Sequence, residues 1–243
     1  MNNIGKKIVF VWIACCALFM ASAQQPTIVH DENAQVRQVG DFHAVRVATG
    51  IHLYLSQGGP NTVAVSANDL EFRDKIRTEV KDGILNIYLD NAGWNLWNKS
   101  GKQLKAYVSC AQLDKLHASS GANVDVDGTL KSPNLALEFS SGAQFTGKVE
   151  VGSLDLQQNS GARATISGTA TRLKADASSG SSLHGYDLVA DDCSIAASSG
   201  GKVDITVQKG MTVSAHSGGH VSYRGAGVIS QVSTGSGGSV SRR

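Results

Sequence analysis

The loop at residues 91–101 holds the side chains best suited to binding chemistry. It reads Asn-Ala-Gly-Trp-Asn-Leu-Trp-Asn-Lys-Ser-Gly, with Asn95 between Trp94 and Trp97. Paired indole rings can stack on a sugar ring while neighbouring amides hydrogen-bond to its hydroxyls. The alternative is that Trp94 or Trp97 folds back and covers the end of a hydrophobic core. Trp94, Asn95 and Trp97 are therefore candidate glycan contacts, with a structural role as the rival.

A second candidate is the serine that stands directly before a glycine in a recurring motif. In register with the repeat, the pair occurs seven times, with its glycines at positions 121, 142, 161, 180, 200, 218 and 237. A nucleophilic serine needs a general base and an oxyanion hole, and the Gly-x-Ser-x-Gly elbow that would supply this setting is missing from the sequence. Seven copies of one serine cannot all be nucleophiles. We interpret the motif as a structural corner, formed by Ser120, Gly121, Ser141, Gly142, Ser160, Gly161, Ser179, Gly180, Ser199, Gly200, Ser217 and Gly218.

Acidic residues and histidines give no metal site in the sequence. Asp125 and Asp191 stand at different positions of the repeat, whereas Ca²⁺ needs six to eight converging oxygens. His216 and His220 flank one corner and could approach each other, but Zn²⁺ needs a third and a fourth ligand that the pattern does not supply. The sequence thus predicts no metal, no cofactor and no catalytic residues.

The spacing of the glycines indicates a stacked repeat. Successive glycines are 18 to 21 residues apart, a regular period typical of solenoids. Apolar residues alternate on both sides of each corner, as Leu135, Leu137 and Phe139 do before Gly142. Such alternation indicates strands with one buried face. The sequence predicts an all-β fold: a right-handed parallel β-helix, or β-solenoid, with coils of about 19 residues.

The same alternation carries an expectation for the corner serines. If the alternation continues up to the glycine, the serine directly before that glycine points inward. Stacked coils would then align these hydroxyls in a ladder whose members hydrogen-bond to one another, because a buried hydroxyl without a partner is costly.

The chain before residue 113 is less regular. We expect a polar tether at 24–39, then one solenoid domain at 40–243 with irregular capping coils at 40–112 and regular repeats at 113–243. Within the irregular part, the Asp82-Gly83 turn lies between two apolar runs and predicts a hairpin over 76–89. Asn68-Asp69 predicts the start of a helical turn that reaches about Arg73, and residues 103–110 read as one more strand.

The first 23 residues read as a secretory signal peptide. Lys6 and Lys7 precede an apolar run at 8–20, and Ala-Ser-Ala at 21–23 predicts cleavage after Ala23. Cleavage removes two of 22 basic and none of 20 acidic residues, so the mature chain holds 20 of each. This balance argues against nucleic acid as a partner. Cys110 and Cys193 lie about four coils apart, too far for a disulfide, and no transmembrane segment is expected.

Three stretches followed by the serine-glycine repeats resemble a known family. They are Asp-Phe-His-Ala-Val-Arg-Val at 41–47, Thr-Gly-Ile-His-Leu-Tyr-Leu-Ser-Gln-Gly at 49–58 and Thr-Glu-Val-Lys-Asp-Gly-Ile-Leu-Asn-Ile-Tyr at 78–88. Over about residues 40–236 the chain is similar to the putative autotransporter adhesin, head GIN domain family of Bacteroidetes-type bacteria. The resemblance implies a right-handed β-helix exported beyond the inner membrane and a role in adhesion. It brings no functional residues with it.

The sequence favours a non-enzymatic, exported cell-envelope or surface protein that binds a glycan or a cell-surface protein through a rigid solenoid surface. Two alternatives stay open: a polysaccharide-active enzyme on a β-helix, and a structural envelope protein that associates with itself. Strand edges in the last coil, around Val240, predict a tendency to form homo-oligomers.

Overall fold

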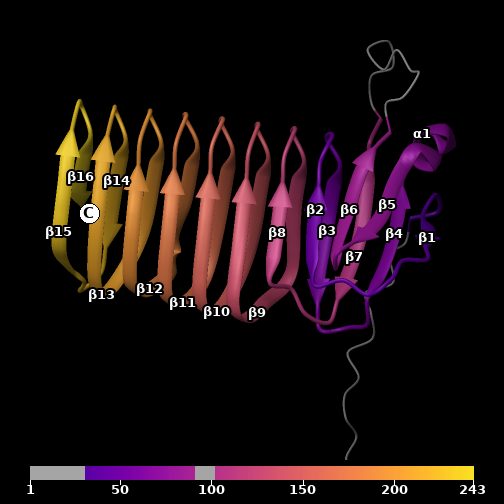
Figure 1. The fold of residues 1–243 in the computed structure, drawn as a ribbon, viewed down its shortest axis with the longest axis horizontal. Helices are drawn as coiled ribbons and strands as arrows, with labels where there is room; N and C mark the ends of the chain where they lie inside the picture. The colour runs from indigo at the N-terminus through magenta and orange to yellow at the C-terminus, as the bar shows by residue number, and fades with distance from the viewer. Residues whose placement is uncertain (1–30, 91–101) are drawn as a thin grey trace, which may run out of the picture.

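The computed structural model describes residues 31–90 and 102–243 as one elongated stack of strands with a short helix (Figure 1). Within these residues the helix is α1 (Leu70–Lys75). The strands are β1 (Gln35–Arg37), β2 (Ala44–Val47), β3 (His52–Gln57), β4 (Thr62–Ser66), β5 (Ile76–Lys81), β6 (Ile84–Leu89), β7 (Lys105–Cys110), β8 (Lys115–Ala118), β9 (Asn123–Phe139), β10 (Gln144–Gln158), β11 (Arg163–Ala177), β12 (Ser182–Ala197), β13 (Lys202–His216), β14 (His220–Arg224), β15 (Val228–Gly235) and β16 (Ser239–Arg242).

Each regular coil consists of one long strand that bends and contributes to two walls. In β13, residues 202–206 pair with β14, while residues 210–216 pair with β15. The pairing from β9 to β13 is parallel, and equivalent side chains stack from coil to coil, as Leu154 does on Leu173. The predicted β-solenoid with coils of about 19 residues is confirmed. The sequence suggested two short strands per coil; in the structure they join into one long strand, and the pairing register shifts at the bend in most coils.

The walls enclose one continuous hydrophobic core. The inward positions before the turn hold residues such as Leu135 and Leu137, and the inward positions after the turn hold residues such as Phe145 and Val149; all four are at most 2% exposed. Phe139 stacks on Phe145 with ring centroids 5.0 Å apart. One coil cannot bury these side chains alone, so the stability of each coil depends on its neighbours.

The serine-glycine corner is a tight turn of two left-handed residues. Ser141 has φ of 51° and Gly142 has φ of 73°, and the amide of Ala143 donates to the carbonyl of Ser140 at 3.0 Å. This is the pattern of a type I′ turn. A Cβ on Gly142 would meet no atom within 4 Å, so glycine is needed for its backbone angle and not for space.

The expected inward serine ladder is wrong. Ser141 is exposed, and the inward positions are Phe139 and Ala143 on either side of the turn. Two left-handed residues place the serine at the tip and restart the alternation after the glycine. The ladder along this edge is made by the backbone instead: the amide of each turn glycine donates to the serine carbonyl of the following coil, as Gly142 does to Ser160 at 3.0 Å.

The irregular coils follow the expected elements closely. The predicted hairpin is β5 paired antiparallel with β6 around Asp82 and Gly83, which have φ of 52° and 73°. The predicted helical turn is α1, in which the Asp69 carboxylate accepts from the amide of Glu71 at 2.9 Å. The strand expected over 103–110 begins at Lys105.

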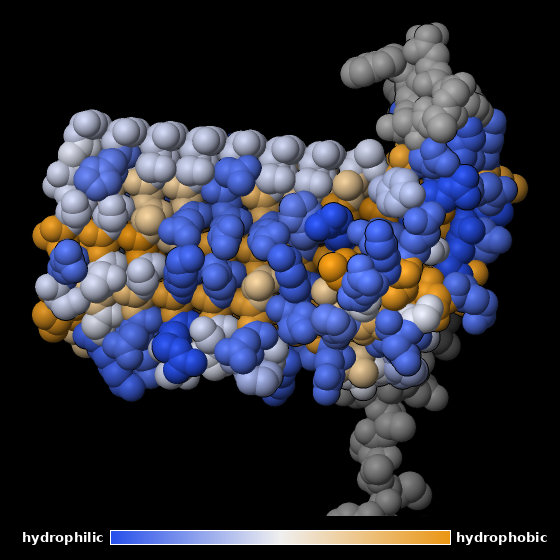
Figure 2. Space-filling model, in the orientation of Figure 1, coloured by the Kyte–Doolittle hydropathy of each residue, from blue (hydrophilic) through white to orange (hydrophobic). Residues whose placement is uncertain are grey.

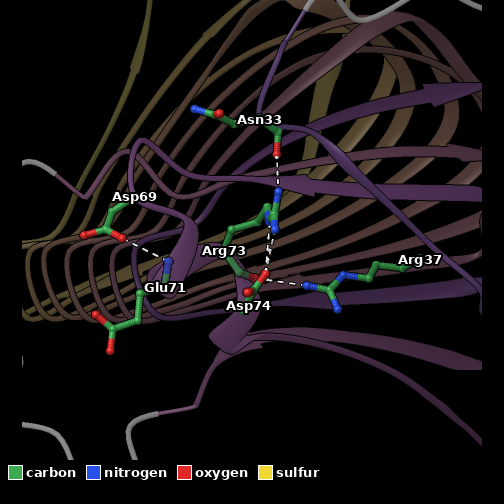
Figure 3. Close-up of polar contacts among 6 residues, drawn as sticks. All are labelled: Asn33, Arg37, Asp69, Glu71, Arg73 and Asp74. Atoms are coloured by element: carbon green, nitrogen blue, oxygen red, sulfur yellow. Dashed lines mark hydrogen bonds and ion pairs between the residues drawn. The ribbon is translucent and has the colours of Figure 1, made fainter.

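Part of the stretch expected to be a tether joins the sheet instead. Strand β1 pairs antiparallel with β4, which pairs antiparallel with β7. Figure 3 shows how this segment is attached to α1: Arg37 donates to the carbonyl of Arg73 at 3.0 Å, and Arg73 donates to the carbonyl of Asn33 at 3.4 Å. These contacts close the N-terminal end of the stack, at the right of Figure 1.

Two further features concern cysteines and membranes. Cys110 and Cys193 are both buried and free, and burial raises their pKa to about 11 and about 12. Both thiols are therefore protonated at neutral pH and act as small core residues. Among the described residues, no helix has the length and hydrophobicity needed to cross a bilayer.

Candidate functional site

The two sets of candidate residues selected from the sequence, the tryptophan loop and the serine-glycine corners, differ in what the structure says about them. Trp94, Asn95 and Trp97 lie outside the described residues. The predicted corner residues line one long edge of the solenoid, where Figure 2 shows a row of evenly spaced, weakly hydrophilic groups along the top. The left-handed turn and the backbone hydrogen bonds between coils explain why the motif recurs along the chain. We therefore assign the corner residues a structural role.

A shallow, open depression lies where strands β3, β7 and β9 begin, beside the turn at Thr49 and Gly50. Its volume is about 550 Å³. Residues from three separate segments form it: Thr49, Gly50, His52, Lys102, Gln103, Leu104 and Asn123. The lining combines an imidazole ring with amide, hydroxyl and ammonium groups, so it can offer both donors and acceptors to a polar ligand.

Two of the lining residues have an unusual backbone. Thr49 has φ of 61° and Gln103 has φ of 37°, both in the left-handed region. For a β-branched residue such as threonine this conformation is strained. The Thr49 hydroxyl oxygen compensates by accepting from the amide of Leu89 at 2.8 Å, which joins the end of β6 to the rim of the depression.

Three aromatic rings stack beside the depression. The His52 ring lies 4.3 Å from the Tyr54 ring, and the Tyr54 ring lies 5.1 Å from the Tyr107 ring, each pair within 15° of parallel. Strand pairing causes the stack, because Tyr54 and Tyr107 are direct cross-strand partners on β3 and β7. Of the three, His52 alone lines the depression. The stack thus holds the imidazole at the edge of the hollow.

A hydrogen bond fixes the same imidazole from the next coil. His52 Nε2 lies 2.6 Å from a carboxylate oxygen of Asp125, which is on β9. Strand β9 pairs with β3 and places Asp125 opposite Tyr54. Ring stacking and the carboxylate contact together restrict the rotation of His52, so a ligand would meet a preorganised ring.

The far end of the stack is anchored to the chain before β1. The Tyr107 hydroxyl donates to the Asp31 carboxylate at 2.9 Å, as does the Ser66 hydroxyl, and Lys105 Nζ lies 3.3 Å away. Burial raises the pKa of Asp31, but hydrogen bonds from Tyr107, Ser66, the Asn33 amide and Lys105 together hold it below its ordinary value. Burial and the bond to Asp31 raise the pKa of Tyr107.

The acidic and histidine candidates do not converge on a metal site. Asp125 is held by His52, and Asp191 pairs with Lys209 Nζ at 2.9 Å. His216 and His220 each contact a serine hydroxyl of the following coil, at 3.4 and 2.9 Å. In the described parts of the chain, no group of three or more His, Cys, Asp or Glu side chains could hold a metal ion.

Sequence reasoning missed the aromatic stack, although one signal was present. Tyr54 stands between Leu53 and Leu55, and Tyr107 stands between Ala106 and Val108, so alternation points both rings outward. Outward aromatic residues on two strands of the irregular coils are a hint of a surface feature. Their pairing could not be read from sequence, because 53 residues separate them.

Comparisons with known proteins agree with this architecture. The family model for the putative auto-transporter adhesin, head GIN domain, matches residues 41–227. The chain belongs to this family. A search of curated proteins finds no relative of this sequence.

Three solved structures show the fold. A putative adhesin from Bacteroides fragilis has a TM-score of 0.77 at 16% identity, over 86% of this chain and 96% of that chain. A putative adhesin from Parabacteroides distasonis has a TM-score of 0.66 at 17% identity, over 87% and 96%. A putative lipid binding protein from the same species has a TM-score of 0.65 at 17% identity, over 88% and 98%.

Proposed function

We propose that this protein is an exported, non-enzymatic adhesin of the cell envelope that binds a glycan at the depression around His52. One observation carries the proposal: a ring held in place by stacking and by Asp125 borders an open hollow lined with amide and hydroxyl groups. The exposed part of the His52 ring, 34% of its side chain, offers a flat surface against which a sugar ring can pack. Gln103 and Asn123 supply donors and acceptors for sugar hydroxyls.

The open shape favours binding to part of a long chain over enclosure of a small molecule. Buried ligand pockets surround most of their ligand's surface, whereas this hollow lies on the outer face of a wall. A glycan could lie across it and continue along neighbouring coils. The same wall continues outward from Asn123 through Gln144 and Arg163, which are register partners on β9, β10 and β11.

The test is a glycan array probed with the purified protein and with a His52→Ala variant. We expect His52→Ala to weaken binding to the selected glycans by at least about tenfold. Lys202→Ala is the matched control, because Lys202 lies on the same outer wall several coils away and should leave binding unchanged. Equal binding by all three proteins would refute the site, and binding to no glycan would refute the ligand class.

Two further measurements test the remaining parts of the proposal. Glycans recovered after long incubation with the protein should be intact, and any shortened product would instead support the enzyme alternative. The signal peptide predicts that the protein isolated from cell envelopes begins at Gln24. An uncleaved N-terminus on cytoplasmic protein would contradict export.

A further inference from the structure

The C-terminal coil presents two strand edges to solvent. Strand β15 pairs with β13, and β16 pairs with β14; in the part of the chain that the structure describes, neither strand has a partner on its other side. All eight residues of β15, Val-Ile-Ser-Gln-Val-Ser-Thr-Gly, are uncharged. Natural edge strands are commonly protected by lysine, proline or a bulge. Strand β15 contains no lysine or proline, and its register against β13 shifts once, at Ser230.

The same coil exposes apolar side chains that other coils bury. Val232 is the register partner of Val213 on β13, yet Val232 is 55% exposed and Val213 is 4% exposed. Val228, at the start of β15, is 69% exposed as well, but its register partner is Gly210, so it stands at an outward position of the wall. Ile229 and Val240 are partly buried against the core. Figure 2 shows hydrophobic surface at the left end, where Figure 1 places β15.

The other end of the molecule cannot receive this surface. There the chain adds antiparallel strands β1 and β4 and the helix α1 to the stack. A second copy therefore cannot continue the solenoid head to tail without displacing those segments. The surface of a second copy that matches an open coil is its own open coil, with the same strand edges and the same exposed valines.

We propose that two copies associate tail to tail through β15 and β16, related by a two-fold axis. A two-fold axis perpendicular to the solenoid axis reverses the strand direction across the joint, so the edge strands pair antiparallel. The pairing satisfies backbone groups of β15 and covers the inward side chain of Val232. The nearby arginine does not oppose it strongly, because Arg242 donates to the Gly225 carbonyl at 2.7 Å and lies over the Tyr223 ring.

The arrangement would place the two N-terminal ends at opposite poles of the dimer. If the depression around His52 binds a glycan, as proposed above, the dimer would carry two sites that face different surfaces. Linking two sites raises the strength of attachment without any new contact. This consequence depends on the proposed function, whereas the dimer itself does not.

The first experiment is sedimentation equilibrium of the purified protein over a range of concentrations. We expect a monomer–dimer equilibrium. Val232→Lys should raise the dissociation constant of the dimer by more than about tenfold. In a monomer the lysine side chain reaches solvent from the open coil, but in the dimer its charge would be buried between the two copies without a partner. Val36→Lys is the matched control: Val36 is 69% exposed on β1, at the opposite end of the stack, so this substitution should leave association unchanged.

The second experiment establishes the geometry. Nitroxide labels at Ser236, in the last turn, should lie within about 30 Å of each other in the dimer, whereas labels at Ser120 should lie roughly 60 Å apart, since each coil adds about 4.8 Å. A monomer at every concentration, equal distances for the two label positions, or full association of Val232→Lys would each overturn the proposal. Glycan binding by a monomer would leave the proposed function standing and remove only the dimer.

Discussion

The two ends of the solenoid solve one physical problem in different ways. Every parallel stack has a first and a last coil whose inner side chains and strand edges lack a neighbour. At the N-terminal end, antiparallel strands and α1 cover the core, and Phe72 is 2% exposed. At the C-terminal end, the inward residue Val232, which is the register partner of the buried Val213, is 55% exposed. A repeat therefore builds the middle of the stack, while its ends need irregular sequence or a partner.

The largest expected effect tests the closed end. Phe72→Ala should destabilise the protein by about 3–5 kcal/mol, because it removes a buried aromatic ring from the cap. Leu70→Ala in the same helix is the control, since Leu70 is 53% exposed, and should cost little. Denaturant unfolding measures both. At the open end, Val232→Ala should cost less than about 1 kcal/mol, and an equal cost for Phe72 and Val232 would erase the contrast between the ends.

The turns also differ between early and late coils. Early turns have alanine after the glycine, as at Ala143 and Ala162, whereas late turns have a second glycine, as at Gly219. A Cβ on Gly219 would overlap the carbonyl of Ala197 in the preceding coil. Gly219→Ala should therefore destabilise the late coils by about 2 kcal/mol through overpacking.

The control for this substitution is Gly161→Ala in an early turn. There a Cβ meets nothing within 4 Å, but φ is 73°, so the cost is about 1 kcal/mol of backbone strain. Amide hydrogen exchange can locate each effect in its own coils. A larger cost at Gly161 than at Gly219 would show that close approach to the preceding coil does not limit the late turns.

Between the two ends, a glutamine side chain lies in the core. Gln158 is 2% exposed, lies between Phe139 and Ala177, and its amide atoms find no hydrogen-bond partner among the described residues. Gln158→Leu should stabilise the protein by about 1–2 kcal/mol, since it removes an unsatisfied buried amide. Thermal unfolding of Gln158→Leu beside the exposed-site variant Gln157→Leu measures the gain, and destabilisation would mean that the amide is satisfied in solution.

The smallest expected effect concerns acid. The pKa of Asp31 is lowered from 3.8 in the folded protein, so its contribution is complete above pH 3.8 and is lost as pH falls through the lower folded value. Loss of its hydrogen bonds should loosen the N-terminal segment by about 1 kcal/mol. Hydrogen exchange in β1 and β4 above and below pH 3.8 would detect it. Asp31→Asn should remove this pH-dependent change in hydrogen exchange, whereas the neighbouring Glu32→Gln should keep it. A change in both variants, or in neither, would contradict its assignment to Asp31.

Several elements of the fold could be predicted because their signals are local. The hairpin around Asp82-Gly83 and the helical turn after Asp69 each depend on a few adjacent residues. The position of Ser141 could not be predicted in the same way, since the type I′ turn restarts the alternation between Phe139 and Ala143. Strand β1 could not be predicted either, because its polar sequence shows no alternation and the strand forms by pairing with β4.

The solenoid and its coil length follow from local sequence, because a glycine every 18 to 21 residues and alternating apolar side chains permit few other packings. Which distant side chains meet depends on how the strands pair. Tyr54, Tyr107 and Asp125 come together around His52 because β3 pairs with both β7 and β9, and strand register is set by the whole stack. Packing also leaves one end covered and the other open, since burial depends on what packs against a coil and not on the coil's own residues.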